Sequence, residues 1–137
     1  MENHLPKIAH IAISVSNIER TANFYRKHFG FCLAEKYSHK DIGLTIAVLK
    51  NGNSALELFE FKRRKALPRY RKGLESDLRT LGVKHFSFEV ADIEKTLLRL
   101  RRAKVRLATD IRTFDNGLRY FFLKDPDGIL VEVMEAS

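Results

Sequence analysis

The chain contains the same pattern twice, and this repeat constrains its fold more than any other feature. A shift of 75 positions superposes the two halves, because His10 falls on His85 and Glu57 on Glu132 (85 − 10 = 75 and 132 − 57 = 75). A repeat of this kind indicates two copies of one structural unit. We therefore expect two modules, residues 5–61 and 82–137, joined by a basic segment, residues 62–81. The same shift also pairs Val15 with Val90, Ile18 with Ile93, Glu19 with Glu94, Thr21 with Thr96, Arg26 with Arg101 and Glu60 with Glu135.

Each module is predicted to contain a strand, a helix and then further strands. Large apolar residues alternate with His10, Ala12 and Ser14 in residues 8–15, which is typical of a strand with two different faces. Residues 16–19 (SNIE) match a capping box, which predicts a helix that ends at Gly30, and Asp92 is the expected N-cap in the second copy. Further strands are predicted at residues 44–50, 55–61, 120–124 and 129–135, with turns at 51–53, 115–117 and 125–128.

Length and composition bound the class of protein. A chain of 137 residues with 45% hydrophobic residues can bury one sizeable core, so we expect a single domain over residues 1–137. Cys32 is the only cysteine and lies in an apolar run, so we expect a buried thiol and no internal disulfide. No stretch of eighteen apolar residues and no apolar leader occurs. These features predict a cytoplasmic protein without a membrane partner.

The net charge of +8 raises the question of anionic partners. Basic residues cluster at 62–65, 69–72 and 99–106, but without a reading helix or aromatic residues spaced for stacking. No nucleic-acid partner is therefore expected. A solvated charged surface explains the clusters, and the alternative is attraction of an anionic small molecule toward a cleft.

Four residues of the repeat are candidates for one metal site. A carboxylate in the middle of an apolar strand is costly to bury unless it is paired or bound to a cation, and Glu57 and Glu132 occupy the same point of both modules. Taken singly, a strand histidine is usually a hydrogen-bonded structural residue, and either glutamate could lie on an exposed face. Taken together, His10, Glu57, His85 and Glu132 can converge on one divalent ion, the alternative being a degenerate or empty cleft.

Several motifs resemble those of a known group of proteins. Residues 10–15 (HIAISV), 56–58 (LEL), 84–90 (KHFSFEV) and 125–128 (DPDG) followed by Glu132 are similar to the vicinal oxygen chelate superfamily over nearly the whole chain. The ligand order His, Glu, His, Glu is similar to that of glyoxalase I, the lactoylglutathione lyase, within the glyoxalase, bleomycin resistance and dioxygenase family. The resemblance implies an α+β fold in which two tandem βαβββ modules form a curved mixed sheet.

The resemblance also implies an activity and its residues. It implies a lyase or isomerase that binds one divalent ion (Ni, Zn, Co, Fe or Mn) and transfers a proton through a metal-stabilised enediolate. Glu132 would be the principal base, with Glu57 as its counterpart. The substrate would be small and oxygenated or thiol-conjugated. Short two-module members resemble homodimers, in which each site would draw His10 and Glu57 from one chain and His85 and Glu132 from the other. The alternative is a monomer in which the two modules of one chain close on each other.

Two positions depart from the bacterial type of glyoxalase I. That type grips glutathione with an arginine four residues beyond the first ligand and an asparagine four residues beyond the second, where this chain has Ser14 and Phe61. Basic residues of the connecting segment are candidates to bind an anionic group of the substrate instead. The alternatives are extradiol-type dioxygenase, epimerase or thiol transferase chemistry, or non-catalytic binding of a small molecule or drug. The expected substrate-binding residues are Ser14, Phe59, Phe61, Arg69, Arg71, Phe122 and Met134.

Overall fold

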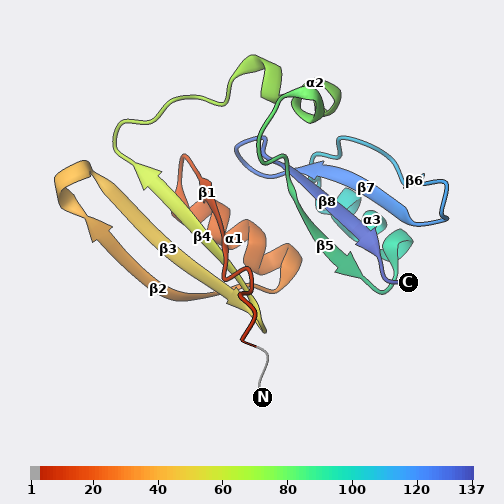
Figure 1. Cartoon of the computed structure of the whole chain (residues 1–137), viewed down its shortest axis with the longest axis horizontal. Helices are drawn as coiled ribbons and strands as arrows, with labels where there is room; N and C mark the ends of the chain where they lie inside the picture. Colours follow the sequence, from red (N-terminus) through yellow and green to blue (C-terminus); the bar gives the residue numbers. More distant parts are fainter. Residues whose placement is uncertain (1–3) are drawn as a thin grey trace. The chain divides into compact units, whose positions relative to one another are not determined.

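The chain forms two compact units in the computed structural model, which describes residues 4–137. Unit 1 ends at Arg64, and unit 2 is Lys65–Ser137. The boundary between them lies inside the segment that connects the two repeats (Figure 1). No described helix combines the length and the apolar character needed to cross a membrane.

Unit 1 is a four-stranded mixed sheet with one helix on a face. The strand order is β1-β4-β3-β2, and β1 runs parallel to β4 while the other neighbours are antiparallel. This order arises because the strand, helix, strand connection places β2 at the far edge of the sheet, and two hairpins then lead back to β4 beside β1. The elements are β1 (Ile11–Ser14), α1 (Ile18–Phe29), β2 (Cys32–His39), the 3₁₀ turn η1 (Lys40–Ile42), β3 (Leu44–Asn51) and β4 (Ser54–Phe61).

Unit 2 repeats this plan after a helical connection. Its strand order is β5-β8-β7-β6, with β5 parallel to β8 and the other pairs antiparallel, so the expected α+β fold with two βαβββ modules is confirmed (Figure 1). The α2 helix was not expected from the sequence. The elements are η2 (Arg69–Arg71), α2 (Leu74–Arg79), β5 (Phe86–Val90), α3 (Ile93–Arg102), β6 (Arg112–Thr113), β7 (Arg119–Lys124) and β8 (Leu130–Glu135).

The two faces of each sheet carry different side chains. On β4, Leu56 and Leu58 are buried, and the next residue of this face, Glu60, accepts a hydrogen bond of 2.9 Å from the backbone N–H of Ile18 at the start of α1. Because side chains alternate along a strand, Glu57 lies on the opposite face. On β8 the buried Val131 and Val133 and the intervening Glu132 follow the same alternation. We call the face with Leu56 or Val131 the helix face, and the face with Glu57 or Glu132 the Glu face.

The helix ends follow the sequence with one correction. The capping box predicts Ser16 as the N-cap of α1, but the N-cap is Asn17, whose side chain accepts from the backbone N–H of Arg20. Both residues can cap a helix, and Ser16 instead accepts from the guanidinium of Arg20. Asp92 caps α3 as predicted, and Gly30 ends α1 in the left-handed conformation at φ 73°.

The prediction of a buried thiol at Cys32 was wrong. Cys32 is exposed, as is every other residue of β2. The reason is that β2 is the edge strand of its sheet, so apolar neighbours in the sequence do not place it in the core.

Candidate metal centre

Unit 1 carries the first His–Glu pair on its Glu face. The Nε2 atom of His10 lies 3.3 Å from a carboxylate oxygen of Glu57, with side-chain exposures of 46% and 16%. His10 directly precedes β1, and Ala12, two residues later, is the register partner of Glu57. Since the register partners of parallel strands share a face, the strand alternation brings His10 and Glu57 together.

Unit 2 carries the second pair at the equivalent place. The Nε2 atom of His85 lies 3.3 Å from a carboxylate oxygen of Glu132, with side-chain exposures of 25% and 10%. His85 directly precedes β5, and Glu132 lies between its register partners Ser87 and Phe122. The ring of Phe122 meets the imidazole of His85 edge-on, with centroids 4.9 Å apart. The sequence predicts all four residues within strands, but the two histidines lie one residue before them, where a strand boundary is least defined.

The geometry of both pairs fits two neighbouring ligands of one metal ion. Zinc–nitrogen distances of about 2.0–2.1 Å and zinc–oxygen distances of about 2.0–2.2 Å place adjacent ligand atoms about 2.9–3.5 Å apart. The observed 3.3 Å between imidazole nitrogen and carboxylate oxygen falls in this range in both units. Imidazole with carboxylate is also a donor set that suits zinc, nickel, iron, cobalt and manganese.

Each unit carries one His–Glu pair. Within either unit of the described chain, residues 4–137, no group of three or more His, Cys, Asp or Glu side chains is placed to hold a metal ion. A site with four protein ligands therefore takes one pair from each module. That four-ligand site remains a prediction.

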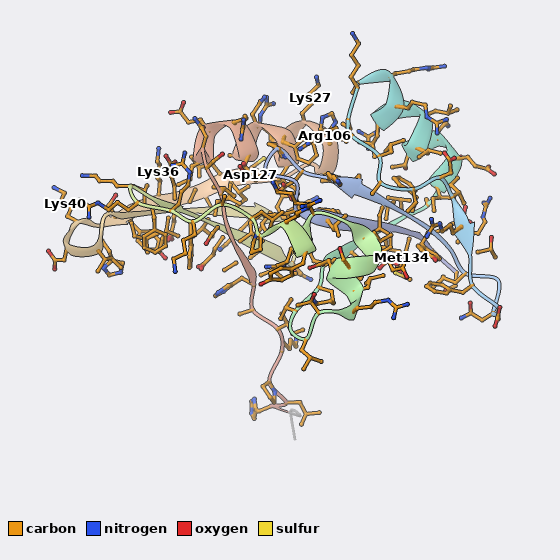
Figure 2. The ribbon with its side chains drawn as sticks, turned by 90° about the horizontal axis from the view of Figure 1, so that it is seen from above. Lys27, Lys36, Lys40, Arg106, Asp127 and Met134 are labelled. Atoms are coloured by element: carbon orange, nitrogen blue, oxygen red, sulfur yellow. The ribbon has the colours of Figure 1, made fainter. Side chains whose placement is uncertain are left out.

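The uncharged residues predicted to bind substrate lie on the Glu faces. In unit 1 Ser14 is the register partner of Phe59, and Phe61 follows two residues later on the same side as Glu57. In unit 2 Phe122 is the partner of Glu132, and Met134 follows two residues after Glu132. Figure 2 labels Met134 on β8, on the side of the strand away from α3.

The two arginines predicted to bind substrate lie in η2, and one of them already has a partner. The Nε of Arg71 donates a hydrogen bond of 3.0 Å to Asp77 of α2, whose side chain is buried. The ammonium of Lys84 lies 3.7 Å from the same carboxylate oxygen. Arg71 is therefore committed to fixing the connecting segment, whereas Arg69 is exposed.

Two aromatic residues on the Glu face of unit 2 were missed by the sequence reasoning. Tyr120 is the register partner of Met134, and its ring meets Phe122 edge-on at 5.9 Å. Phe114 stacks on Tyr120 with centroids 4.2 Å apart and an interplanar angle of 19°. Strand alternation along residues 119–124 is a signal that places Tyr120 beside Phe122, but Phe114 joins them only through the β6–β7 hairpin.

Comparison with known proteins assigns the family. The model of the Glyoxalase/Bleomycin resistance protein/Dioxygenase superfamily matches residues 7–133. The chain belongs to this superfamily. The expected membership is thus confirmed, and with it the duplicated βαβββ plan as a superfamily fold.

Relatives within the superfamily have different activities. The chain is 27% identical over 136 residues to human mitochondrial methylmalonyl-CoA epimerase, covering 97% of this chain and 76% of that protein. It is 28% identical to the uncharacterized Bacillus subtilis protein YwkD, covering 96% and 98% of the two chains. Among solved structures, a glyoxalase family protein from Enterococcus faecalis aligns with a TM-score of 0.80 at 30% identity, covering 94% and 97%. The trypanothione-dependent glyoxalase I of Leishmania major aligns with a TM-score of 0.74 at 19% identity, covering 96% and 87%, which is a likeness of fold.

Proposed function

We propose that this protein is a divalent-metal-dependent lyase or isomerase that moves a proton at a carbon next to a carbonyl group. The duplicated His–Glu pair, with the same 3.3 Å geometry at the same point of both modules, is the observation that carries the proposal. In this proposal His10, Glu57, His85 and Glu132 hold one ion, which is Ni, Zn, Co, Fe or Mn. The substrate is a small oxygenated or thiol-conjugated molecule.

In this proposal all four residues bind the ion, and the two glutamates also transfer the proton. When bound, the ion polarises neighbouring substrate oxygens and stabilises the negative charge that develops as a proton leaves the adjacent carbon. His10 and His85 act only as fixed ligands of the ion. A carboxylate oxygen of Glu132 accepts the proton, and either Glu132 or its counterpart Glu57 returns it. The buried ring of Phe122 beside Glu132 keeps water from this carboxylate.

Two substrates represent the two variants of this reaction. The ligand order His, Glu, His, Glu favours glyoxalase I chemistry, in which the proton moves between adjacent carbons of a thiol conjugate. The 27% identity to human methylmalonyl-CoA epimerase over 97% of the chain favours the second variant, in which the proton returns to the other face of the same carbon. Both variants begin with removal of a proton next to a carbonyl, so one exchange measurement tests both.

The test compares metal-reloaded protein with a base variant. Protein is stripped of metal and reloaded separately with Ni, Co, Zn, Mn and Fe. Thioester formation is measured with methylglyoxal plus glutathione, and hydrogen exchange of methylmalonyl-CoA in deuterium oxide is measured by mass spectrometry. We expect one reaction to proceed with at least one metal, and Glu132→Gln to slow it by about 1,000-fold, within the usual range for loss of a general base.

A matched control separates chemistry from folding. Glu75→Gln changes an exposed glutamate of α2 and should leave the rate unchanged. Metal binding without exchange of either substrate would contradict the lyase or isomerase assignment and favour a binding protein, whereas oxygen uptake with iron would favour dioxygenase chemistry. Absence of metal binding by calorimetry would contradict the site itself.

A further inference from the structure

An arginine of unit 2 occupies a position at which unit 1 has no arginine. The guanidinium of Arg119 lies between two glutamates of unit 2. It donates hydrogen bonds of 2.8 and 2.9 Å to the two carboxylate oxygens of Glu135, and one of 2.8 Å to Glu94. A guanidinium bound to both oxygens of one carboxylate forms a strong and directional ion pair. The start of α3 and the end of β8 therefore form a guanidinium site in unit 2.

The same two glutamates recur in unit 1. The shift of 75 positions that relates the modules pairs Glu135 with Glu60, and it also pairs Glu94 with Glu19. Glu60 accepts a hydrogen bond from the first residue of α1, as Glu135 does from the first residue of α3. Glu19 and Glu94 are both exposed, and Glu60 and Glu135 are both half-buried. Within residues 4–137, however, no basic side chain forms an ion pair with Glu19 or Glu60.

A threonine stands in unit 1 where the arginine stands in unit 2. Arg119 begins β7 and Glu135 ends β8, one step beyond the last register pair of these antiparallel strands, so the two residues face each other. In unit 1 the register partner of Glu60 is Thr45. The hydroxyl of Thr45 lies 3.4 Å from that of Ser38 on the next strand. This short side chain does not extend between the glutamates as the longer Arg119 does.

A cavity of about 530 Å³ lies at this place in unit 1. Its volume is within the range of small-molecule sites, about 300–1,000 Å³. Because Glu60 belongs to the helix face, the cavity lies on the other side of the sheet from the His10–Glu57 pair. Its lining includes both glutamates, Thr45 and three basic residues without an ion pair in the described chain, residues 4–137, namely Lys36, Lys62 and Arg64. The cavity therefore offers carboxylates and cations to one ligand.

We propose that this cavity binds a guanidino acid, a small molecule with a guanidinium at one end and a carboxylate at the other. The guanidinium lies between Glu19 and Glu60, as that of Arg119 lies between their counterparts. The carboxylate pairs with the basic residues of the lining. A guanidinium is favoured over an ammonium because its planar fork donates to both oxygens of one carboxylate and to a second carboxylate at once. This site is separate from the proposed metal site.

Four small probes separate the contributions of the two charged ends. γ-Guanidinobutyrate carries both groups, propylguanidine only the cation and butyrate only the carboxylate, whereas δ-aminovalerate has an ammonium in place of the guanidinium. Dissociation constants are measured by calorimetry with the full chain, free of metal. We expect guanidinobutyrate to bind about tenfold more tightly than propylguanidine or aminovalerate, and butyrate to show no measurable binding.

Charge-removing variants test the two glutamates. Glu60→Gln keeps an acceptor for the backbone N–H at the start of α1, and Glu19→Gln changes an exposed residue, so both variants should fold. We expect each to weaken the binding of guanidinobutyrate by about tenfold or more. Glu94→Gln is the matched control, because Arg119 already occupies the equivalent site of unit 2. It should leave the affinity unchanged.

The decisive variant gives unit 1 the arginine of unit 2. In Thr45→Arg we expect the new guanidinium to pair with Glu19 and Glu60, to abolish the binding of guanidinobutyrate and to raise the midpoint of thermal unfolding by about 3 °C. Thr45→Met adds a side chain of similar length without charge and should not raise the midpoint. This control separates pairing with the glutamates from mere filling of the cavity.

None of these measurements involves a metal ion, so their outcomes leave the proposed function untouched. Absence of guanidinobutyrate binding by the original chain would overturn the inference. Binding that persists in Thr45→Arg, or in both glutamine variants of unit 1, would overturn it as well. Butyrate binding as tight as that of guanidinobutyrate would show that the basic residues alone hold the ligand, which also contradicts a guanidinium site.

Discussion

The repeat places His10 and His85 at equivalent positions, and likewise Glu57 and Glu132. This equivalence predicts the effect of single substitutions on metal affinity. If both pairs hold one ion, His10→Ala and His85→Ala remove the same kind of donor from the same site. We expect each substitution to weaken metal binding by at least about 100-fold, since even indirect partners of metal ligands contribute 10- to 100-fold. Competition with a chromophoric chelator measures this loss.

The control for this prediction is another exposed histidine. His4→Ala should leave metal affinity unchanged, because His4 is exposed and lies outside the pairs. A tenfold or smaller effect of His10→Ala beside a large effect of His85→Ala would show that unit 2 alone dominates binding.

Asp77 is the second residue for which a single substitution has a predictable effect, in this case on the free energy of unfolding. Its buried carboxylate accepts from Arg71 and lies 3.7 Å from the ammonium of Lys84, which directly precedes His85. We expect Asp77→Asn to lower the free energy of unfolding by about 2 kcal/mol, less than for a fully buried pair because both cations are partly exposed. Urea denaturation measures this change. Glu75→Gln, which breaks an exposed ion pair of the same helix, should cost less than about 0.5 kcal/mol.

At the scale of elements, an equivalent glutamate of the last strand accepts a hydrogen bond from the start of the helix in both modules. Glu60 accepts from the N–H of Ile18, and its counterpart Glu135 accepts from the N–H of Ile93. Glu135 also accepts two hydrogen bonds from Arg119 of β7, at 2.8 and 2.9 Å. These bonds hold the pKa of Glu135 below its ordinary value of 4.5, and they raise the pKa of Arg119.

This link predicts a pH dependence of stability. Because the pKa of Glu135 is lower in the folded chain, its contribution is complete above the ordinary pKa of 4.5 and is lost as the pH falls through the lower folded value. Glu135→Gln should therefore destabilise the protein at about pH 7 and have a smaller effect at about pH 3. Urea denaturation at both values measures the difference. An equal loss at both would contradict the role of the ionised carboxylate.

The elements show which parts of the fold a sequence can reveal. Strands with alternating apolar and polar residues, and turns rich in Gly, Asn and Asp, were predicted because a local sequence pattern indicates each of them. The repeat then identified the two His–Glu pairs. The α2 helix was missed because its six residues are too short for an amphipathic pattern. The pairing of Arg71 with Asp77 and the stacking of Phe114 on Tyr120 join residues through tertiary structure, which no local pattern encodes.

At the scale of the whole molecule, the division of ligands between modules raises the question of which chains complete a site. Each unit carries one His–Glu pair, so the proposed four-ligand site uses either both pairs of one chain or one pair from each of two chains. We propose the second arrangement, a homodimer with shared sites. A two-fold dimer then contains two identical sites, each with His10 and Glu57 from one subunit and His85 and Glu132 from the other.

Mixing two inactive variants distinguishes the arrangements. One variant carries His10→Ala with Glu57→Gln, and the other carries His85→Ala with Glu132→Gln, so neither has a complete site alone. In a mixed dimer with shared sites, the intact pair of each subunit meets the intact pair of the other and restores one site of two. After unfolding and refolding an equal mixture, we expect about a quarter of the original number of high-affinity metal sites, as random pairing of subunits gives for a two-fold dimer. Recovery of none in a mixture that light scattering shows to be dimeric would place each site within one chain.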